Sequence, residues 1–402
     1  MSERALSGVT VLDLSQYITG PYCTRLLADY GADVIKIEQP GSGDVGRHRG
    51  PFFHDQPTPD ASGPFLHLNA NKRSITLNLK TASGRRILRR LVAEADILVE
   101  SFPPATASSL GLDYSELRSL NPALVMASIS NFGQEGPYRD YKSSEIITYA
   151  MGGPMYATGL AEREPVKLGA NVIQHHAGAS CAAATMIALT QAEQTGLGDH
   201  LDFSLMRAQA ANMDRRTTMF VGFQHTKEVN RRLSIGSAPG AGVSPSADGY
   251  FAMSGDGARF HLTAKMIGHP ELLEDPRFQD DTARAQPGRR EEFEEYFLPW
   301  ALSYTKREIF QQAQAQHIPS APINDAADLL AEPVFHERGF WSTIDHPVGR
   351  VVDTGRPFIM NRTPWEIRRP APLLGEHNRE VLGGLLGMSA PELASLRESG
   401  VI

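Results

Sequence analysis

Two apolar runs separated by one short helical pattern constrain the fold of this chain most strongly. Residues 9–14 read VTVLDL and residues 32–38 read ADVIKIE, and both are the continuous apolar, β-branched runs typical of buried strands. Between them a turn at Gly20-Pro21 leads into helical spacing through Cys23 and Leu27. A strand, a helix and a second strand in this order indicate a βαβ unit, which requires a parallel sheet.

Strands and helices keep alternating further along the chain. Apolar runs at 96–99 and 124–129 predict two more strands, and residues 74–79 alternate polar and apolar side chains as a half-exposed strand would. Apolar residues between 87 and 95 recur on one face of a predicted helix. Residues 45–66 lack periodicity and predict a long loop. The sequence therefore predicts an α/β fold with a doubly wound parallel sheet.

The second half of the chain predicts a linker and a smaller unit. The sequence is polar and glycine-rich between about 220 and 245, which is typical of a linker. The smaller unit is expected to start near Asp248, to contain a helix over 290–304 and to end near Ile323. Residues 371–377 have loop composition and precede a helical tail.

Composition excludes several classes of function. With 41% hydrophobic and 21% charged residues, the 402-residue chain suits a soluble globular protein of two or three domains. The net charge of −7 is spread over mixed signs, so we expect no nucleic-acid partner, although a local basic pocket for an anionic ligand is compatible with it. We expect no membrane partner, because no apolar run approaches the roughly 20 residues of a membrane span. Cys23 and Cys181 are interpreted as buried free thiols in a reducing, cytoplasmic setting.

The stretch 164–186 has the pattern of a functional site. An extended segment at 169–171 is expected to lead into the Gln-His-His sequence at 174–176, and a small-residue helix is expected over 177–194. A tight turn that opens such a helix lets another backbone approach closely and leaves N–H groups facing a ligand. Periodicity leaves open whether residues 201–210 form a strand or a helix.

The motifs of several common chemistries are absent. The chain has no G-x-G-x-x-G after its first strand and no Walker A sequence, so the two common phosphate fingerprints are missing. It also lacks H-E-x-x-H, Cys-x-x-Cys and the G-x-S-x-G nucleophile elbow. His175 and His176 are adjacent and would point about 100° apart on a helix, so we expect no metal site.

A series of short motifs remains, each of them weak alone and specific in this order. They are VLD (11–13), GP (20–21), LADYGADVIKIE (27–38), GSGD (41–44), NKRSI (71–75), ESFP (100–103), SISNFGQEGPY (128–138), GG (152–153), TG (195–196), DPRF (275–278) and APLLG (371–375). In this series the chain resembles the class III (CaiB/BaiF-type) CoA-transferase family over nearly its whole length.

The resemblance implies an interlocked dimer, in which two subunits are threaded like linked rings. It implies a large Rossmann-like domain formed by 1–220 and a returning segment at 326–402, a linker at 221–245 and a smaller α/β domain at 246–325. The substrates would be coenzyme A, as an acyl-CoA thioester, and a carboxylic acid. No tightly bound cofactor is implied.

The resemblance also implies which residues contact CoA. These are Tyr17, Gln39, Arg73, Leu77, Lys80, Ser101, Phe102 and Lys142. The cations suit the phosphates, and the aromatic and apolar side chains suit the adenine and pantetheine. For each of them, a solvated surface cation or an ordinary core residue is an equally good interpretation. Family members often carry basic residues where this chain has Gln39 and Ser109, so the predicted site has fewer cations than usual.

The position of the family nucleophile is occupied by an amide. The family's transferases use an aspartate that attacks the thioester, and the spacing to Gly178 places Gln174 there. No Asp or Glu lies between Glu164 and Glu193 to replace it. A histidine nucleophile at His175 or His176 is a weaker alternative.

A second acidic position of the family persists as Glu145. In the family it faces the active site; here it is interpreted either as a catalytic residue or as a helix-capping Glu paired with Lys142. Related racemases carry a histidine base where this chain has Ser144, so both racemase bases are absent.

Two hypotheses from different classes follow. In the first, the chain is the non-nucleophilic subunit of a heteromeric CoA-transferase resembling benzylsuccinate CoA-transferase, and a paralogous subunit supplies the aspartate. In the second, it is a homodimeric protein that binds CoA esters or regulates without catalysis. A homodimeric enzyme with altered chemistry is a third, less favoured alternative.

Overall fold

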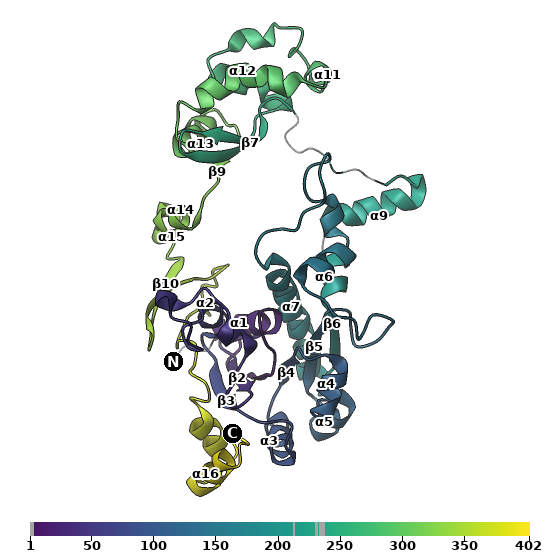
Figure 1. The fold of residues 1–402 in the computed structure, drawn as a ribbon, viewed down its shortest axis with the longest axis vertical. Helices are drawn as coiled ribbons and strands as arrows, with labels where there is room; N and C mark the ends of the chain where they lie inside the picture. The colour runs from purple at the N-terminus through teal and green to yellow at the C-terminus, as the bar shows by residue number, and fades with distance from the viewer. Residues whose placement is uncertain (1–3, 212–213, 230–231, 233–237) are drawn as a thin grey trace. The chain divides into compact units, whose positions relative to one another are not determined.

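The computed structural model describes residues 4–211, 214–229, 232 and 238–402. The chain divides into two compact units (Figure 1). The first comprises Met1–Thr158, Pro165–Asn230 and Gly339–Ile402, and the second comprises Gly159–Glu164 and Arg231–Arg338. The smaller domain predicted at 246–325 lies within the second unit. Residues 230–231 and 233–237 of the predicted linker lie outside the described residues.

A six-stranded parallel sheet forms the centre of the first unit (Figure 1). Its strand order, β3-β2-β1-β4-β5-β6, is that of the doubly wound Rossmann sheet. The α/β fold with a parallel sheet is therefore confirmed. The strands are β1 (Thr10–Asp13), β2 (Asp33–Glu38), β3 (Arg73–Thr76), β4 (Ile97–Glu100), β5 (Val125–Ser130) and β6 (His200–Ser204).

Ten α-helices are described in the first unit. They are α1 (Thr19–Asp29), α2 (Gly63–Asn69), α3 (Ala82–Val92), α4 (Pro104–Ser109), α5 (Tyr114–Leu120), α6 (Glu145–Met151), α7 (Val172–Thr195), α8 (Leu205–Ala211), α9 (Asp214–Thr226) and α16 (Ala390–Glu398). The segment 201–210, which periodicity left open, forms most of β6 and then α8.

Alternate side chains of the central strands pack on opposite faces of the sheet. Leu12 and Ile35 belong to the apolar core that includes α3, whereas Val11 and Val34 belong to the core that includes α1 and α7. Each buried side chain of this size contributes roughly 1.5–3 kcal/mol. Because both faces are covered, the strands have continuous apolar sequences rather than alternating ones.

Helix α7 begins earlier than predicted, at Val172 instead of residue 177. The backbone N–H groups of Gln174 and His175 both donate to the carbonyl oxygen of Asn171, so this turn is already helical. Farther along, a Cβ atom on Gly178 would lie 2.6 Å from the carbonyl oxygen of Thr19. The glycine therefore permits the close approach of α7 to the start of α1. The sequence predicted a close approach of another backbone at a turn that opens the helix, whereas Gly178 lies inside the helix.

Strand β3 is fully buried, so the half-exposed strand expected at 74–79 is wrong. Its polar side chains are covered by the C-terminal segment. The side-chain oxygen of Asn378 accepts from the N–H of Thr76 at 2.8 Å, and the hydroxyl of Ser74 accepts from the N–H of Gly375 at 3.0 Å. These hydrogen bonds join segments about 300 residues apart, so the local sequence around β3 does not indicate that the strand is covered.

The loop expected at 45–66 is partly ordered into helix. It contains two short 3-10 helices, Val45–His48 and Phe53–Asp55, and the start of α2. The hydroxyl of Ser62 caps α2 by accepting from the N–H of Phe65. Each of these helices is one or two turns long, which is too short to give a periodic pattern.

The C-terminal segment is held against α1 by buried polar contacts. The guanidinium of Arg25 binds Asp29 at 2.7 Å and Asp353 at 3.2 Å, and the indole N–H of Trp365 donates to Asp29 at 2.8 Å. Asp353 belongs to an antiparallel hairpin of β10 (Trp341–His346) and β11 (Gly349–Thr354).

The second unit packs helices on a small antiparallel sheet. Its core is rich in aromatic side chains, including Phe251, Phe260 and Phe293. The unit starts earlier than Asp248, because residues 241–246 form a strand that pairs with the strand at 249–254. Its elements are β7 (Ala241–Ser246), β8 (Gly249–Ser254), α10 (Phe260–Met266), α11 (Asp281–Arg284), α12 (Arg289–Ala301), α13 (Lys306–Ala315), β9 (Ser320–Pro322), α14 (Ala326–Ala331) and α15 (Pro333–Glu337).

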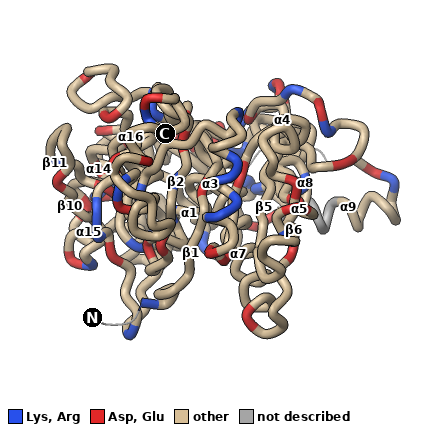
Figure 2. The backbone as a smooth tube through the Cα atoms, turned by 90° about the horizontal axis from the view of Figure 1, so that it is seen from below, with Lys and Arg blue, Asp and Glu red and all other residues tan. Residues whose placement is uncertain are grey.

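Basic and acidic residues are interspersed along the backbone, as the mixed signs in the sequence predict (Figure 2). None of the helices in the described ranges has the length and apolar character needed to cross a bilayer.

Candidate active site

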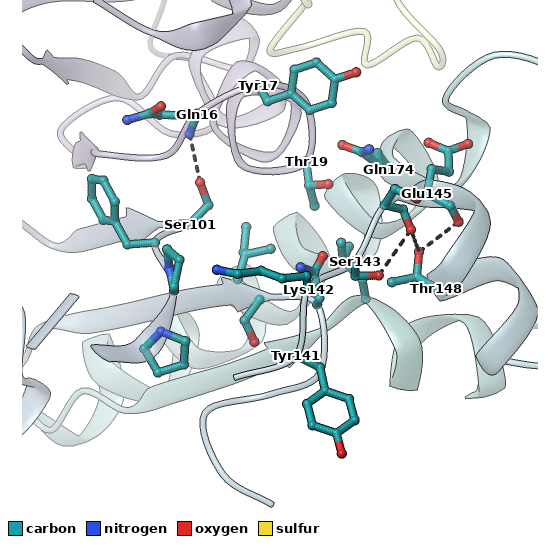
Figure 3. Close-up of a pocket in the computed structure, with 18 of the residues that line it drawn as sticks. Gln16, Tyr17, Thr19, Ser101, Tyr141, Lys142, Ser143, Glu145, Thr148 and Gln174 are labelled. Carbon is teal, nitrogen blue, oxygen red and sulfur yellow. Dashed lines mark hydrogen bonds between the residues drawn. The ribbon is translucent and has the colours of Figure 1, made fainter. Parts of the chain in front are cut away.

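A cavity of about 1020 Å³ lies at the carboxyl ends of three neighbouring strands of the sheet (Figure 3). Gln16 and Tyr17 follow β1, Ser101 and Phe102 follow β4, and Ser130 ends β5. The segment from 139 to 146 and the start of α7 also line it. Ligand sites of parallel α/β sheets are found at this edge.

The cavity brings together many of the predicted site residues. Tyr17, Ser101, Phe102, Lys142, Glu145 and Gln174 all line it. In Figure 3, Gln174 and Glu145 lie on one side of the cavity and Ser101 on the other, and the side chain of Lys142 extends toward the Ser101 side. The two candidate catalytic positions therefore share one cavity with candidate CoA contacts.

The other predicted CoA contacts do not line this cavity. Gln39 and Lys80 are exposed elsewhere, and Leu77 is buried in the apolar core. Arg73 is ion-paired with Asp33, and with Glu380 at 3.0 Å. For these four residues a role in CoA binding stays a prediction.

Tyr17 has an unusual backbone conformation for a bulky residue, with φ at 73°. Its N–H donates to Asp44 at 3.0 Å, and the preceding N–H, of Gln16, donates to the hydroxyl of Ser101 at 2.9 Å. These two bonds fix the turn after β1 to the segments that follow β2 and β4. The turn thereby places the Tyr17 side chain in the cavity wall.

A buried charge network supports this turn. The ammonium of Lys36 lies 2.7 Å from Asp44 and 3.8 Å from Asp13, and it donates to the carbonyl oxygen of Ser15 at 3.0 Å. Lys72 binds Asp13 at 2.9 Å, and both lysines are fully buried. Burial lowers the pKa of Lys72 to about 8, although the negative charge of Asp13 acts to raise it. Burial alone would raise the pKa of Asp13, but the two ammonium groups hold it well below its usual range.

Comparison with known proteins decides the family. The family model described as CoA-transferase family III matches residues 6–378. This chain belongs to CoA-transferase family III. Family III CoA-transferases use CoA thioesters as substrates, and no tightly bound cofactor is implied by the family.

Curated relatives are similar over almost their whole length. The chain is 34% identical to a succinyl-CoA–D-citramalate CoA-transferase of Chloroflexus aurantiacus, over 99% of this chain and 98% of the relative. It is 32% identical to the succinyl-CoA:(R)-benzylsuccinate CoA-transferase subunit BbsE of Thauera aromatica, over 95% of each. A crystal structure of a CAIB/BAIF family protein from Brucella suis superposes with a TM-score of 0.85 at 29% identity, and covers 96% of this chain and 100% of that one.

In this family III chain, Gln174 lies in the first turn of α7. Its side-chain amide makes no hydrogen bond to another part of the described chain, so it is free to meet a ligand in the cavity. The next residue, His175, is turned away: its Nδ1 lies 3.0 Å from the carbonyl oxygen of Asn171, and its ring packs edge-on against Tyr22. His175 and His176 line a separate cavity of about 380 Å³.

Glu145 begins α6 and is 9% exposed. Neither carboxylate oxygen has a hydrogen-bond partner among the described residues, and the nearest ammonium, of Lys167, is 3.5 Å away. Burial raises the pKa of Glu145, and Lys167 opposes that rise. The ion-pair partner is therefore Lys167, not Lys142. Lys167 also donates to the carbonyl oxygens of Leu168 and Ala170 at 2.6 Å, which ties Glu145 to the segment before α7.

Sequence analysis did not single out Glu100. It is the last residue of β4 and directly precedes the cavity residues Ser101 and Phe102 in the sequence. It is fully buried, and one of its oxygens accepts from the N–H of Phe102 at 2.7 Å. Burial raises the pKa of Glu100 to about 7, although hydrogen bonds from Ser128 and Phe102 oppose the rise. Its place in the ESFP motif was the only sequence signal.

Three cations that line the cavity were also missed: Arg49, Arg139 and Lys167. Arg49 lies in the aperiodic segment 45–66, and Arg139 and Lys167 lie in loops. A cation in a loop gives no pattern that distinguishes a ligand contact from a solvated side chain, so only the folded chain identifies them. Among the described residues no cluster of three or more His, Cys, Asp or Glu side chains could hold a metal ion.

Proposed function

We propose that this chain is the non-nucleophilic subunit of a heteromeric family III CoA-transferase, which moves CoA from an acyl-CoA thioester to a carboxylic acid. A paralogous chain with Asp at the position of Gln174 would be its partner. The observation that carries the proposal is the amide of Gln174 in the cavity wall, where the resemblance to the family expects a carboxylate.

An amide cannot replace that carboxylate. Its nitrogen lone pair is delocalised, and it forms no anhydride that could pass an acyl group on. The carboxylates that do line the cavity are Asp140 and Glu145. The Asp140 side chain is 75% exposed, and the carboxylate of Glu145 lies against the ammonium of Lys167 at 3.5 Å. The site of this chain is therefore suited to binding CoA esters rather than to attacking them.

In the proposed complex the partner's aspartate performs the covalent steps. Its carboxylate attacks the thioester carbonyl and expels CoA thiolate, which leaves a mixed anhydride. The thiolate then attacks the aspartyl carbonyl, so that the donor acid departs and an enzyme thioester remains. The acceptor carboxylate repeats the two steps in reverse order and leaves as the new acyl-CoA, which regenerates the aspartate.

One further observation and one expectation from the family support a heteromer. The benzylsuccinate relative, 32% identical over 95% of this chain, is itself named as a subunit. In the interlocked dimer expected from the family, a chain without the nucleophile would still be required, because it supplies half of the subunit interface. The buried free thiols of Cys23 and Cys181 suit the reducing cytoplasm, which we propose as its compartment.

Coexpression tests this proposal. The chain, an Asp-containing paralogue from the same genome and the two together are purified, and CoA transfer from succinyl-CoA to carboxylic acids is measured. Transfer is expected from the copurified pair and not from this chain alone, and an Asp→Asn change in the paralogue should abolish it. A homodimer of this chain that transfers CoA as fast as the pair would contradict the proposal. A homodimer that binds CoA esters, takes no partner and transfers nothing would favour the binding-protein hypothesis.

A further inference from the structure

The ammonium of Lys167 joins two segments of the cavity wall. It lies 3.5 Å from a carboxylate oxygen of Glu145, the first residue of α6. The same ammonium donates to the carbonyl oxygens of Leu168 and Ala170, each at 2.6 Å. These two residues belong to the segment just before α7, which begins at Val172. One charged group thereby links the start of α6 to the segment that leads into α7.

The segment before α7 has a backbone conformation that such a link stabilises. Ala170 has a φ of 51°, in the left-handed region that a residue with a Cβ rarely adopts. Asn171 precedes the helix, but its side chain makes no capping hydrogen bond. The bonds from Lys167 to the carbonyl oxygens on both sides of this turn therefore hold it in place. Gln174 follows only four residues after Ala170, in the first turn of the helix.

Glu145 depends on Lys167 for its opposite charge. The Glu145 side chain is 7% exposed, and neither of its oxygens has a hydrogen-bond partner among the described residues. Burial raises the pKa of Glu145; Lys167 is first among the groups that oppose the rise, followed by the N–H of Ile173 and by His175. A charge pair with so little access to water is weakly screened by salt, so the attraction holds the carboxylate toward α7.

We propose that Lys167 is a positioning residue for the transfer reaction: its ammonium fixes the carboxylate of Glu145 against the turn that opens α7. This inference rests on the proposed function, in which the reacting acid enters this cavity and meets Glu145. Lys167 has two roles in it, as the counter-charge of Glu145 and as the donor to two carbonyl oxygens. Different substitutions separate these roles, because Arg keeps both the charge and the donors, Gln keeps donors alone and Met keeps neither.

Steady-state transfer from succinyl-CoA by the copurified complex tests the inference. Lys167→Met is expected to lower kcat about tenfold or more, because Glu145 is no longer held in place. The KM for succinyl-CoA should not change, since the ammonium is engaged by protein groups and not by the ester. Lys167→Arg should keep most of the activity. Lys167→Gln should lose kcat as the Met variant does, and it replaces that variant if Lys167→Met fails to fold.

Two further readouts distinguish positioning of Glu145 from a general effect on the fold. Loss of the ammonium raises the pKa of Glu145 further, so the acidic limb of the kcat profile should move to higher pH in Lys167→Met. In a Glu145→Gln background the same substitution should lower kcat no further, because the group that Lys167 positions is already gone.

The matched control is Lys306→Met in the second unit. Lys306 likewise joins a carboxylate, that of Asp328, to a carbonyl oxygen, that of Ile323 at 3.3 Å, and it does not line the cavity. Its loss should lower the unfolding temperature but leave kcat and the pH profile of the complex unchanged.

Three results would overturn the inference. The first is a folded Lys167→Met or Lys167→Gln variant that turns over as fast as the wild type. The second is a loss of kcat that multiplies with the loss caused by Glu145→Gln, which would show that the two residues act independently. The third is a raised KM for succinyl-CoA with kcat unchanged, which would make Lys167 a ligand contact.

A wild-type complex that transfers nothing would contradict the proposed function instead. Chemical denaturation of the Lys167→Met, Glu145→Gln and double variants then still tests the inference, because it needs no activity. The two substitutions are expected to be coupled, so that Lys167→Met costs less stability when Glu145 is already Gln. Additive effects on stability would overturn the inference.

Discussion

The ammonium of Lys36 and the carboxylate of Asp44 form a fully buried ion pair, with 2.7 Å between Nζ and Oδ2. The other oxygen of Asp44 accepts from the N–H of Tyr17, whose positive φ places its side chain in the cavity wall. A charge pair without access to solvent thereby fixes the conformation of a candidate ligand contact.

Asp44→Asn should destabilise the protein by about 3 kcal/mol, because it leaves a buried ammonium with Asp13 as its nearest counter-ion at 3.8 Å. Chemical denaturation measures the loss. The control is Glu116→Gln, which removes an exposed ion pair with Arg89 and should cost less than about 1 kcal/mol. Weaker CoA binding by the folded Asn variant would show that the pair also positions Tyr17. Equal stability of the two variants would show that the network does not support the fold.

Glu100→Gln should make stability less dependent on pH. In the folded chain the pKa of Glu100 is raised to about 7, above its ordinary value of 4.5. The folded state therefore holds this proton more tightly, and stability is lost as pH rises from about 4.5 to 7, by about 3 kcal/mol in total. Gln keeps the acceptor for the N–H of Phe102 and carries no charge. Denaturation at pH 5 and pH 8 should show the variant gaining stability over the wild type only at the higher pH; an equal difference at both pH values would count against a raised pKa.

Glu145→Gln should stabilise the fold and impair the reaction. Burial raises the pKa of this carboxyl despite the ion pair with Lys167, so a neutral amide removes a desolvation cost that is larger than the attraction it gives up. If Glu145 meets the acceptor or orients the partner's aspartate, turnover of the complex falls while CoA affinity is kept. Denaturation and steady-state transfer are measured on the same preparation. A variant that is more stable and fully active would assign Glu145 no part in the reaction.

Gly178→Ala should move α7 away from α1. The new Cβ would meet the carbonyl oxygen of Thr19 at 2.6 Å, and such overpacking costs about 1–3 kcal/mol, which offsets the better helix propensity of Ala. Gly169→Ala is the matched control, since nothing lies within 4 Å of its added Cβ. Loss of stability and of CoA binding is expected for the first variant alone. If both variants behave like the wild type, the close approach of the two helices is not required.

Gln174→Asp should restore the missing chemistry. If only the nucleophile is lacking, the variant chain forms an enzyme thioester with CoA when it is incubated with succinyl-CoA. Gln174→Asn is the control, because it shortens the side chain equally without supplying a carboxylate. Intact-mass spectrometry detects the thioester. Failure of the folded, CoA-binding Asp variant to form it would show that more than the nucleophile has been lost.

The sheet could be predicted from the sequence because its strands carry their signal locally. Residues 9–14 and 32–38 carry apolar side chains toward both faces of the sheet, so the sequence itself indicates that both faces are covered. The burial of strand β3 could not be predicted, for the opposite reason. Ser74 and Thr76 are polar but buried, and their hydrogen-bond partners lie at the other end of the chain.

The residues of the candidate site fall into two similar groups: those whose place follows from a predicted strand, and those that only the folded chain brings to the cavity. Tyr17, Ser101 and Phe102 follow predicted strands, so their place at the carboxyl edge of the sheet could be expected. Arg49 and Arg139 could not be expected there, because loop geometry brings them to the cavity. The pairing of Arg73 with Asp33 and Glu380 likewise depends on the fold.

In the proposed complex this chain binds CoA esters but does not supply the nucleophile. The most direct test is intact-mass analysis of both chains of the copurified complex during turnover with succinyl-CoA. We expect a covalent CoA thioester on the partner and an unmodified mass for this chain. A CoA adduct on this chain, at Glu145 or at any other residue, would contradict it.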